Sequence, residues 1–462
     1  MRFRPWRQFA TLALVLTIGW MRPAGAQPPT PAPGTRPAAT TPAAGAPAPA
    51  VPAPGQVLSL PAAIDLALKL NPALRSGAEG RRAAEARVPQ AQSGYYPRLD
   101  ATGSLSSSKV SSSSLERTGR SDSTAVVLQG RQLLYDFGKT SALVDEARAN
   151  VRVSDTELER IREVVVLNVR QSYFTLLQAR RLTGVADAAV SRAELNLRSA
   201  RGFFEVGTRP KSDVTRAEVE VANARVGQIR ARNSVRLAEV SLVTAIGLEA
   251  QRSIEVEDIL EYEPVPLDPA AFLTEALENR PELGQARARL EAARAQLGGA
   301  RAGFWPDLNL NGSYGTSSGD ALVGVDGFAV ASFGETWSIS ATLSWNLFQG
   351  FFTTHKVRET TALVEVARAN YDAFELQVRL DVEQAYITLV EAAERIAATA
   401  KAVESATENL RLSQGRYDAG VGTILDLTEA QLALTNAEAD QIRALTDYKL
   451  GLAALDRAVG RP

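Results

Sequence analysis

The motif Tyr96-Pro97-Arg98-Leu99 returns 209 residues later as Trp305-Pro306-Asp307-Leu308. Upstream of it, the step Asn71-Pro72 corresponds at the same spacing to Arg280-Pro281. Downstream, the spacing becomes 213 and then stays constant for more than a hundred residues. The pairs at that spacing are Leu134-Tyr135 and Leu347-Phe348, Tyr173 and Tyr386, Gly202 and Gly415, Gly207 and Gly420, Asp213 and Asp426, Asn223 and Asn436, and Gly247 and Gly460. The chain therefore contains a duplicated unit of about 200 residues.

Each unit shows the same order of expected elements. A short helix, at 61–70 and again at 269–278, ends at a proline step, because proline disfavours helix at the residue before it. A second helix runs to the aromatic–proline motif and is followed by a serine- and glycine-rich stretch. A long helix without proline comes next, at Thr140–Phe204 and Thr353–Tyr417. At 1.5 Å per residue it makes a rod of roughly 95 Å.

The long helices are expected to end in tight turns. Gly207 and Gly420 reverse the chain into a last helix, which ends near Gly247 and Gly460 as C-cap glycines. The second rod and its last helix carry repeated alanines rather than large residues along one seam. Rows of alanine let helices approach on more than one side, which favours a wall of several helices over a two-stranded coiled coil.

The serine-rich stretches alternate with period two. From Trp337 to Leu347, six apolar residues alternate with serine, threonine and asparagine, and eleven residues is the length of a tilted strand that crosses a bilayer. We expect strands at about 97–106 and 124–136 in the first unit, where Arg131 intrudes, and at about 306–315 and 336–348 in the second. Loops at 106–123 and 316–335 join each pair. A soluble hairpin packed on the helices is the alternative for a single pair, but two equivalent hairpins favour the membrane.

Four aromatic residues lie near the expected strand ends: Trp305, Trp337, Trp345 and Phe348. Tryptophan and other aromatic side chains concentrate at membrane–water interfaces, so we expect these four residues there.

The N-terminus reads as an export signal. Arg2, Arg4 and Arg7 precede a short apolar stretch, and small residues follow up to Ala26. The alternative is a membrane anchor, but the apolar stretch of 13 residues falls short of the roughly 20 that span a bilayer. The expected organisation is a signal peptide at 1–26, a Pro/Ala-rich disordered linker at 27–55, a first repeat at 56–250, a connector at 251–268 and a second repeat at 269–462.

Composition excludes several classes of function. The chain has no cysteine and one histidine, His355, so it offers no thiolate nucleophile and no Cys-rich zinc site. Its 51 basic and 52 acidic residues leave a net charge of −1, which gives no reason to expect nucleic acid as a partner. No phosphate-binding glycine loop is present, and we expect no enzyme activity, cofactor or metal.

Strand number sets the stoichiometry. Four strands cannot close a barrel, and an open sheet edge in lipid leaves unsatisfied backbone groups. Two chains give eight strands with a filled interior, so an aqueous lumen needs at least three chains. The strand count alone does not separate three chains from four.

The order of elements, the duplication and several motifs resemble the TolC-type outer-membrane efflux protein family. The motifs are the two proline steps already quoted, Leu134-Tyr135-Asp136-Phe137-Gly138-Lys139 at the start of the long helix, and Arg416-Tyr417-Asp418-Ala419-Gly420 at its end. The resemblance covers about residues 57–460. It implies a mainly α protein with a transmembrane β-barrel: a homotrimer whose twelve-stranded barrel in outer-membrane lipid continues into a long periplasmic α-helical barrel.

The resemblance also implies function and partners. The chain would be the outer-membrane exit duct of a tripartite efflux or type I secretion system, a passive channel that docks to a periplasmic adaptor (membrane fusion) protein and an inner-membrane transporter. The competing class is a periplasmic or secreted long coiled-coil scaffold without channel activity.

The family places a gate at the periplasmic tip. The matching acidic positions are Asp426 and Glu429, which lie three apart on one helix face, and three chains would place six carboxylates around the aperture. The alternative for Asp426 is a helix-start role, since Asp213 is its equivalent. Tyr417 resembles a tip residue that ties neighbouring helices, with plain packing as its alternative. Gly207 and Gly420 are expected to form the tip turns and the adaptor contact. The family's basic tip residue falls on Gly422 here, which departs from the pattern.

Overall fold

The computed structural model describes residues 57–112, 117–249, 254–322 and 329–461, and the signal and linker predictions lie outside these ranges. The unit that contains them, Val51–Pro462, is one compact body, so the two repeats pack together instead of forming separate domains. Among the described residues, no helix is both long and apolar enough to cross a membrane.

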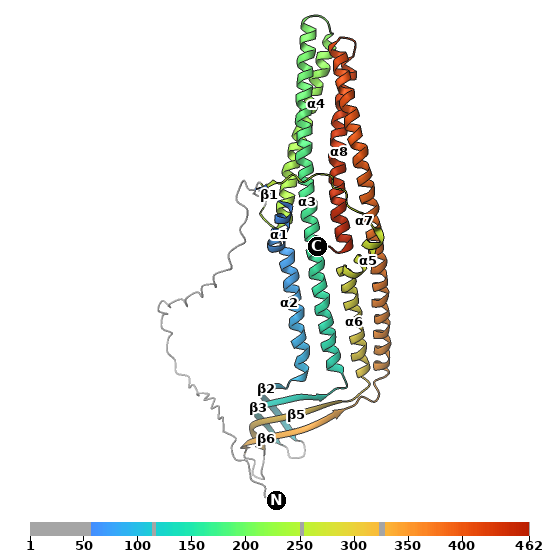
Figure 1. Cartoon of the computed structure of the whole chain (residues 1–462). Coiled ribbons are helices and arrows are strands. Elements are labelled where there is room, and N and C mark those ends of the chain that lie inside the picture. The colour runs from blue at the N-terminus through green and yellow to red at the C-terminus, as the bar shows by residue number, and fades with distance from the viewer. Residues whose placement is uncertain (1–56, 113–116, 250–253, 323–328, 462) are drawn as a thin grey trace, which may run out of the picture. The chain divides into compact units, whose positions relative to one another are not determined.

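The two repeats form equivalent elements (Figure 1). The first contains β1 (Val57–Leu58), α1 (Leu60–Leu70), α2 (Pro72–Gln92), the short 3-10 helix η1 (Ser93–Tyr95), β2 (Arg98–Ser112), β3 (Arg117–Tyr135), α3 (Lys139–Glu205) and α4 (Lys211–Ile246). The second contains β4 (Glu255–Val256), α5 (Pro269–Asn279), α6 (Pro281–Ala302), β5 (Asp307–Leu322), β6 (Ala329–Ser344), α7 (Phe352–Asp418) and α8 (Ile424–Val459). Because α7 and α8 begin and end 213 residues after α3 and α4, the internal spacing of the sequence is also the spacing of the fold.

The helices form a wall one helix thick. In the half next to the sheet the packing order is α2, α3, α6, α7, and in the other half it is α4, α3, α8, α7. The helices α3 and α7 run the whole length of the wall, from the sheet at one end to the turns before α4 and α8 at the other (Figure 1). The expected wall of several helices is therefore present in one chain.

The motif at residues 134–139 starts the first long helix. The Asp136 carboxylate accepts hydrogen bonds from the backbone N–H groups of Thr140 (2.7 Å) and Gly138 (3.2 Å). Gly138 has a φ of +93°, which side chains rarely allow, so glycine permits the sharp turn from strand to helix. These contacts satisfy donors that the first turn of a helix leaves open.

The four long strands form one antiparallel sheet in the order β2-β3-β5-β6. The register of the first hairpin pairs Arg98 with Arg131, and that of the second pairs Asp307 with Ser344, so the two hairpins are equivalent. The strands β3 and β5 join the hairpins, while β2 and β6 are the two edges of the sheet.

The strand ends differ from the sequence expectation. Much of 106–123 and 316–335, expected as loops, continues the two hairpins as strand, while β6 stops at Ser344 instead of reaching 348. Serine and glycine give no apolar alternation, yet the backbone ladder continues through them, and the hydroxyl oxygens of Ser106 and Ser123 lie 2.7 Å apart across it. The apolar pattern therefore marks only part of each strand.

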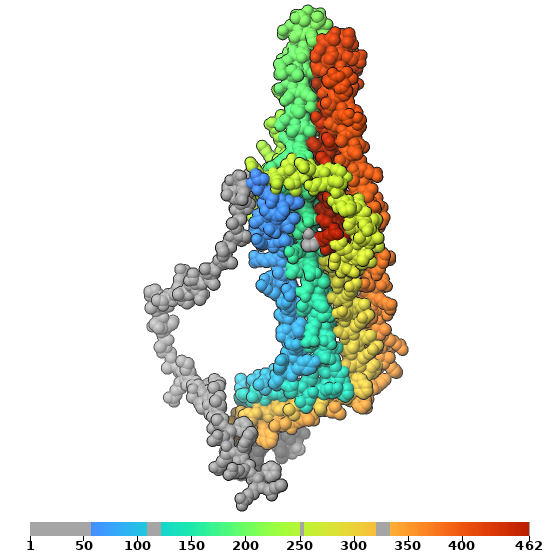
Figure 2. All heavy atoms as spheres, viewed as in Figure 1, coloured from blue at the N-terminus to red at the C-terminus, as the bar shows by residue number. Residues whose placement is uncertain are grey.

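The connector crosses the helical wall at mid-length, as Figure 2 shows. Its strand β4 pairs in parallel with β1, a contact of two residues per strand that the sequence did not predict. The Tyr173 hydroxyl on α3 lies at the C-terminal end of this pair, 3.0 Å from the Leu58 carbonyl oxygen and 2.8 Å from that of Glu257. The surrounding core of α1, α3 and α4 thus ties the connector to the first repeat.

Candidate functional site

The sheet has one apolar face that no other part of the described chain covers. Register places Leu128, Tyr314 and Trp337 side by side on that face, and all three are exposed. Ile339 and Leu343 extend it along β6 and are also exposed. Isolated exposed apolar residues are common on proteins, but a continuous apolar surface of this kind marks an interaction with a membrane or another molecule.

The opposite face of the sheet is polar. Its cross-strand contacts join Asn311 to Thr342 (3.2 Å, Nδ2 to Oγ1) and Ser313 to Ser338 (2.8 Å between hydroxyl oxygens). Arg131, which interrupted the expected strand, lies on this face, where its Nε donates to Oδ1 of Asn309 at 3.2 Å. The arginine is therefore consistent with an amphipathic strand, since its side chain avoids the apolar face.

Three of the four predicted interface aromatics lie where the sheet meets the helices. Trp305 stacks on Phe137 with ring centroids 5.3 Å apart, and Trp345 donates from Nε1 to the Phe304 carbonyl oxygen at 3.1 Å. Phe348 makes an edge contact with Phe351 at 5.4 Å. All three predicted residues are exposed, so they form an aromatic band at one border of the apolar face. Trp337 lies further along the sheet, opposite Tyr314.

The opposite end of the wall consists of two glycine turns. Gly207 has a φ of +73° and Gly420 a φ of +79°, and an added Cβ would meet nothing within 4 Å at either position. Glycine is therefore required there by the backbone conformation and not by crowding. Equivalent hydrogen bonds close both turns, from Thr208 N–H to the Phe203 carbonyl (2.9 Å) and from Val421 N–H to the Arg416 carbonyl (3.0 Å).

Asp426 and Glu429 are both exposed in the first turns of α8. Asp426 forms a capping box with Thr423: each residue's backbone N–H donates to the other's side-chain oxygen at 3.1 Å. The hydrogen bond from the Thr423 hydroxyl holds the pKa of the Asp426 carboxyl below its usual value, so this group stays ionised. The helix-start role of Asp426 is present, and it leaves the carboxylate exposed on the same face as Glu429.

Tyr417 is fully buried between the two turns. The Arg209 guanidinium lies 4.9 Å from its ring centroid, and Phe203 makes an edge contact at 5.8 Å. Arg209 Nη2 also donates to the carbonyl oxygens of Gly422 (2.8 Å) and Tyr417 (3.3 Å). Burial raises the pKa of the Tyr417 hydroxyl, so it stays neutral.

The sequence analysis missed Arg209, although its signal was present. Position 209 is equivalent to Gly422 at the spacing of 213 residues, and Gly422 is where the family's basic tip residue was expected. The turn between α3 and α4 thus supplies the basic side chain that the turn between α7 and α8 lacks at this position, and the arginine ties the two turns of one chain together. The structure therefore brings Arg209 and Tyr417 into contact, and Asp426 and Glu429 do not take part in this contact.

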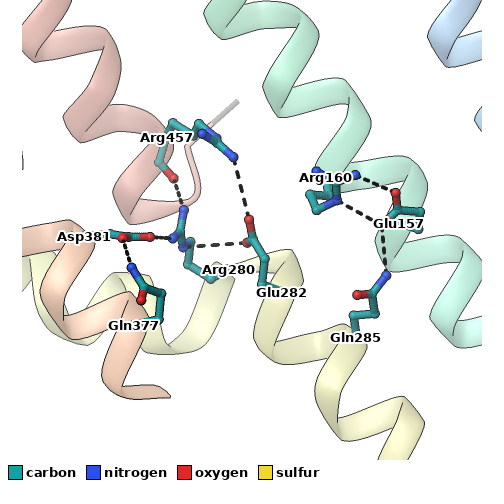
Figure 3. Close-up of polar contacts among 8 residues, drawn as sticks. All are labelled: Glu157, Arg160, Arg280, Glu282, Gln285, Gln377, Asp381 and Arg457. Atoms are coloured by element: carbon teal, nitrogen blue, oxygen red, sulfur yellow. Dashed lines mark hydrogen bonds and ion pairs between the residues drawn. The ribbon is translucent and has the colours of Figure 1, made fainter. Parts of the chain in front are cut away.

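A charged cluster around the buried Arg280 lies in the middle of the wall, where α3, α6, α7 and the end of α8 meet (Figure 3). Arg280, whose side chain is 5% exposed, bonds to Asp381 and donates to the Arg457 carbonyl oxygen at 3.2 Å. Glu282 lies 3.7 Å from Arg280 and 3.9 Å from Arg457. The Arg280-Pro281 step therefore separates α5 from α6, and the Arg280 side chain also links this step to α7 and α8.

Glu163 on α3 faces this cluster without a hydrogen bond to its Oε2 atom. Burial and the nearby Glu282 carboxylate raise the pKa of Glu163 to about 7, while Arg280 and Arg457 pull it down. Because the folded-state pKa lies above the ordinary value of 4.5, the folded chain binds more protons than the unfolded chain between these values. Stability therefore falls as the pH rises through this window.

We predict that Glu163→Gln removes this loss. At pH 8 the variant is expected to be more stable than the parent by up to about 3 kcal/mol, and the gain should vanish below pH 5. Denaturation of the detergent-solubilised protein across this pH range measures the difference. Glu159→Gln, one turn away at an exposed position, is the matched control and should show a much smaller pH dependence, because Glu159 is the weakest of the groups that shift the pKa of Glu163. An equal gain for Glu163→Gln at pH 5 and pH 8 would contradict the assignment.

Within the described ranges, no group of three or more histidine, cysteine or acidic side chains is arranged to hold a metal ion. The charged side chains of the mid-wall cluster pair with one another. What the arrangement does is to separate a polar surface of the sheet from an apolar one.

Comparison with known proteins agrees with this geometry. The family model described as "Outer membrane efflux protein" matches residues 63–248 and again 272–461. Protein CyaE of Bordetella pertussis is 28% identical over 416 residues, which cover 87% of this chain and 84% of CyaE. Outer membrane protein TolC of Escherichia coli is 25% identical over 399 residues, or 84% of this chain and 80% of TolC. Among solved structures, the CmeC outer membrane channel of Campylobacter jejuni superimposes with a TM-score of 0.75 at 20% identity, over 87% of this chain and 85% of CmeC.

Proposed function

Because this chain belongs to the outer membrane efflux protein family, we propose that it is the outer-membrane exit duct of a tripartite efflux or type I secretion system. It is an outer-membrane channel with a periplasmic helical portion, and it makes and breaks no bond. Solute enters at the tip of the helical wall and leaves along the polar face of the sheet.

The two-faced sheet is the observation that carries the proposal. One face is apolar, exposed and bordered by aromatic residues, and the other is lined by hydrogen-bonded serine, threonine and asparagine. A sheet between lipid and water needs this alternation. A coiled-coil scaffold has no use for a membrane-length sheet with an uncovered apolar face, so the sheet argues against that alternative.

The open edges of the sheet support a homotrimer. Both β2 and β6 are edge strands within the described chain. An unpaired edge in lipid costs several kcal/mol for each unsatisfied backbone group, so the edges must pair with other copies. Three copies give twelve strands and a barrel wide enough for water, which continues into the helical wall of the same three chains.

The tip turns are the part of the chain that faces away from the membrane, and we assign the partners to them. Gly207 and Gly420 form the contact with a periplasmic adaptor, which links the duct to an inner-membrane transporter. Asp426 and Glu429 line the aperture, and the buried Tyr417 holds the neighbouring turns together. The support is their position at the free end of the wall, with both carboxylates exposed.

Reconstitution tests the proposal. The purified full chain is expected to fractionate with the outer membrane, to require detergent for extraction and to give discrete conductance steps in a planar bilayer. Two controls test whether the conductance comes from a protein pore: treatment of the channels with trypsin, and recording at high salt. A chain that stays in aqueous buffer as a monomer and leaves the bilayer silent would rule the exit duct out.

A further inference from the structure

The two helices at the side edges of the wall are the repeat equivalents of two helices that pack on each other inside the chain. In the sheet-proximal half, α3 of the first repeat packs on α6 of the second. Their equivalents, α7 and α2, are the outermost helices on opposite sides of the wall. If copies are arranged side by side, α7 of one copy meets α2 of the next in the way that α3 meets α6.

The face of α7 that corresponds to the α6-facing side of α3 is exposed. On α3, the face toward α6 includes Ala149, which is 1% exposed, and Val153, which is half-buried. The equivalents 213 residues later, Ala362 and Val366, are both exposed. The same side of α7 continues through exposed alanines at 369 and 373, small enough for another helix to approach closely.

The face of α2 that corresponds to the α3-facing side of α6 is exposed in the same way. Ala288 and Ala292 on α6 are buried against α3. Their equivalents 209 residues earlier are Glu79 and Ala83, and both are exposed. Each edge helix therefore presents the surface that its counterpart buries within the chain.

An ion pair inside the chain has a charge-reversed counterpart at the edges. Arg152 on α3 bonds to Glu291 on α6. The equivalent of Arg152 is Glu365 on α7, and the equivalent of Glu291 is Arg82 on α2. Both residues are exposed, and Arg82 also contacts Glu79 on its own helix. The positive and the negative charge have exchanged helices, so the two edges of the wall still carry opposite charges at this position.

A second position follows the same rule. Gln296 on α6 donates to the Glu146 carboxylate on α3 at 2.7 Å. The equivalents are Arg87 on α2 and Glu359 on α7, again a basic and an acidic residue. Both are exposed, and Glu359 also pairs with Lys356 on its own helix.

The sheet edges match in the same register. Inside the chain, β3 pairs with β5 so that Gln129 lies opposite Ser313. The equivalents are Thr342 on β6 and Ser104 on β2, and both lie on the polar face. A slip of one residue would place a polar side chain opposite an apolar one, so this register keeps the two faces of a closed sheet separate.

We infer that neighbouring copies join through α7 and α2 in the register set by the internal repeat, with Glu365 opposite Arg82 of the partner subunit and Glu359 opposite Arg87 of the partner subunit. The same register pairs β6 with β2 of the next copy. The inference rests on the proposed trimeric duct and adds to it the residue-level contacts that close the ring.

Cysteine pairs test the register directly, because the natural chain has no cysteine. The matched pairs are Arg82→Cys with Glu365→Cys, and Arg87→Cys with Glu359→Cys, treated in outer membranes with a thiol-specific crosslinker about as long as an Arg–Glu ion pair. Since α3 and α6 separate the two edges of one chain, a crosslink must join two chains. Denaturing electrophoresis is expected to show dimers and trimers at multiples of the chain's own mass.

The mismatched pairs use the same four positions and are the control. Arg82→Cys with Glu359→Cys, and Arg87→Cys with Glu365→Cys, displace one partner by roughly 9 Å along the helix axis. They are expected to crosslink several-fold less. Equal yields from matched and mismatched pairs in a protein that is trimeric by light scattering would overturn the register and leave the duct intact. A monomer in detergent would overturn both proposals, and crosslinks to a different protein would overturn the choice of a second copy as the partner.

Discussion

Ile339→Lys is expected to abolish insertion of the protein into the outer membrane. Ile339 lies on β6 in the middle of the exposed apolar face, opposite Gly312 on β5. A lysine near the bilayer midplane costs about 2–4 kcal/mol on the lipid face of a barrel, and the proposed trimer would carry that cost three times. The amount of folded protein in outer-membrane fractions, measured by resistance to protease, should fall to near zero.

Ser340→Lys is the matched control, one residue further along the same strand. Ser340 lies on the polar face, opposite Asn311, so its lysine would project into water. This variant is expected to insert at nearly the parental level and to shift ion selectivity toward anions in planar bilayers. If Ile339→Lys inserted as well as Ser340→Lys, the apolar face would not be the lipid surface.

The sequence predicted the repeated elements well because their signals are local. Both long helices were expected within one residue of their observed ends, since an uninterrupted helical composition meets a glycine turn at one end and the Asp136-Phe137-Gly138 motif at the other. The internal duplication then provided a second, independent reading of each element.

Other features could not be predicted because they depend on contacts across the fold. The β1–β4 pair has two residues in each strand, which is too short for any periodic pattern. Arg280 and Glu163 lie over a hundred residues apart and become neighbours only when α3 packs on α6. The serine-rich strand ends carry no apolar alternation, so only the backbone ladder reveals them.

The tip illustrates both cases. The turn glycines follow from their positions in the repeat, and the two carboxylates were expected from the resemblance to the family. Arg209 was not predicted, because a basic residue was sought at Gly422, in the turn between α7 and α8. Its place in the turn between α3 and α4 becomes meaningful only when the two turns meet. Comparison of equivalent positions across the repeat is therefore a better guide to the tip than either turn alone.

The second large effect is expected from the acidic residues of α8. Combined Asp426→Asn and Glu429→Gln should weaken block of the channel by a trivalent cation by about tenfold to a hundredfold, or about 1.4–3 kcal/mol. The three chains of the proposed duct place six carboxylates at one constriction, and such rings attract cations. The hydrogen bond from Thr423 keeps the pKa of Asp426 low, so its charge persists at any physiological pH. Single-channel current at increasing cation concentration measures the change.

The amide variants separate charge from structure at this position. Asp426 completes the capping box of α8 with Thr423, and asparagine can accept the same hydrogen bond from the Thr423 backbone N–H, whereas alanine would remove that half of the box together with the charge. Asp213→Asn is the matched control, because it sits at the equivalent position of α4 but is buried, and it should leave the block unchanged. Equal block in the parent and in the Asn/Gln variant would show that these carboxylates do not line the aperture. A weakened block in Asp213→Asn would place the ring at the start of α4 instead.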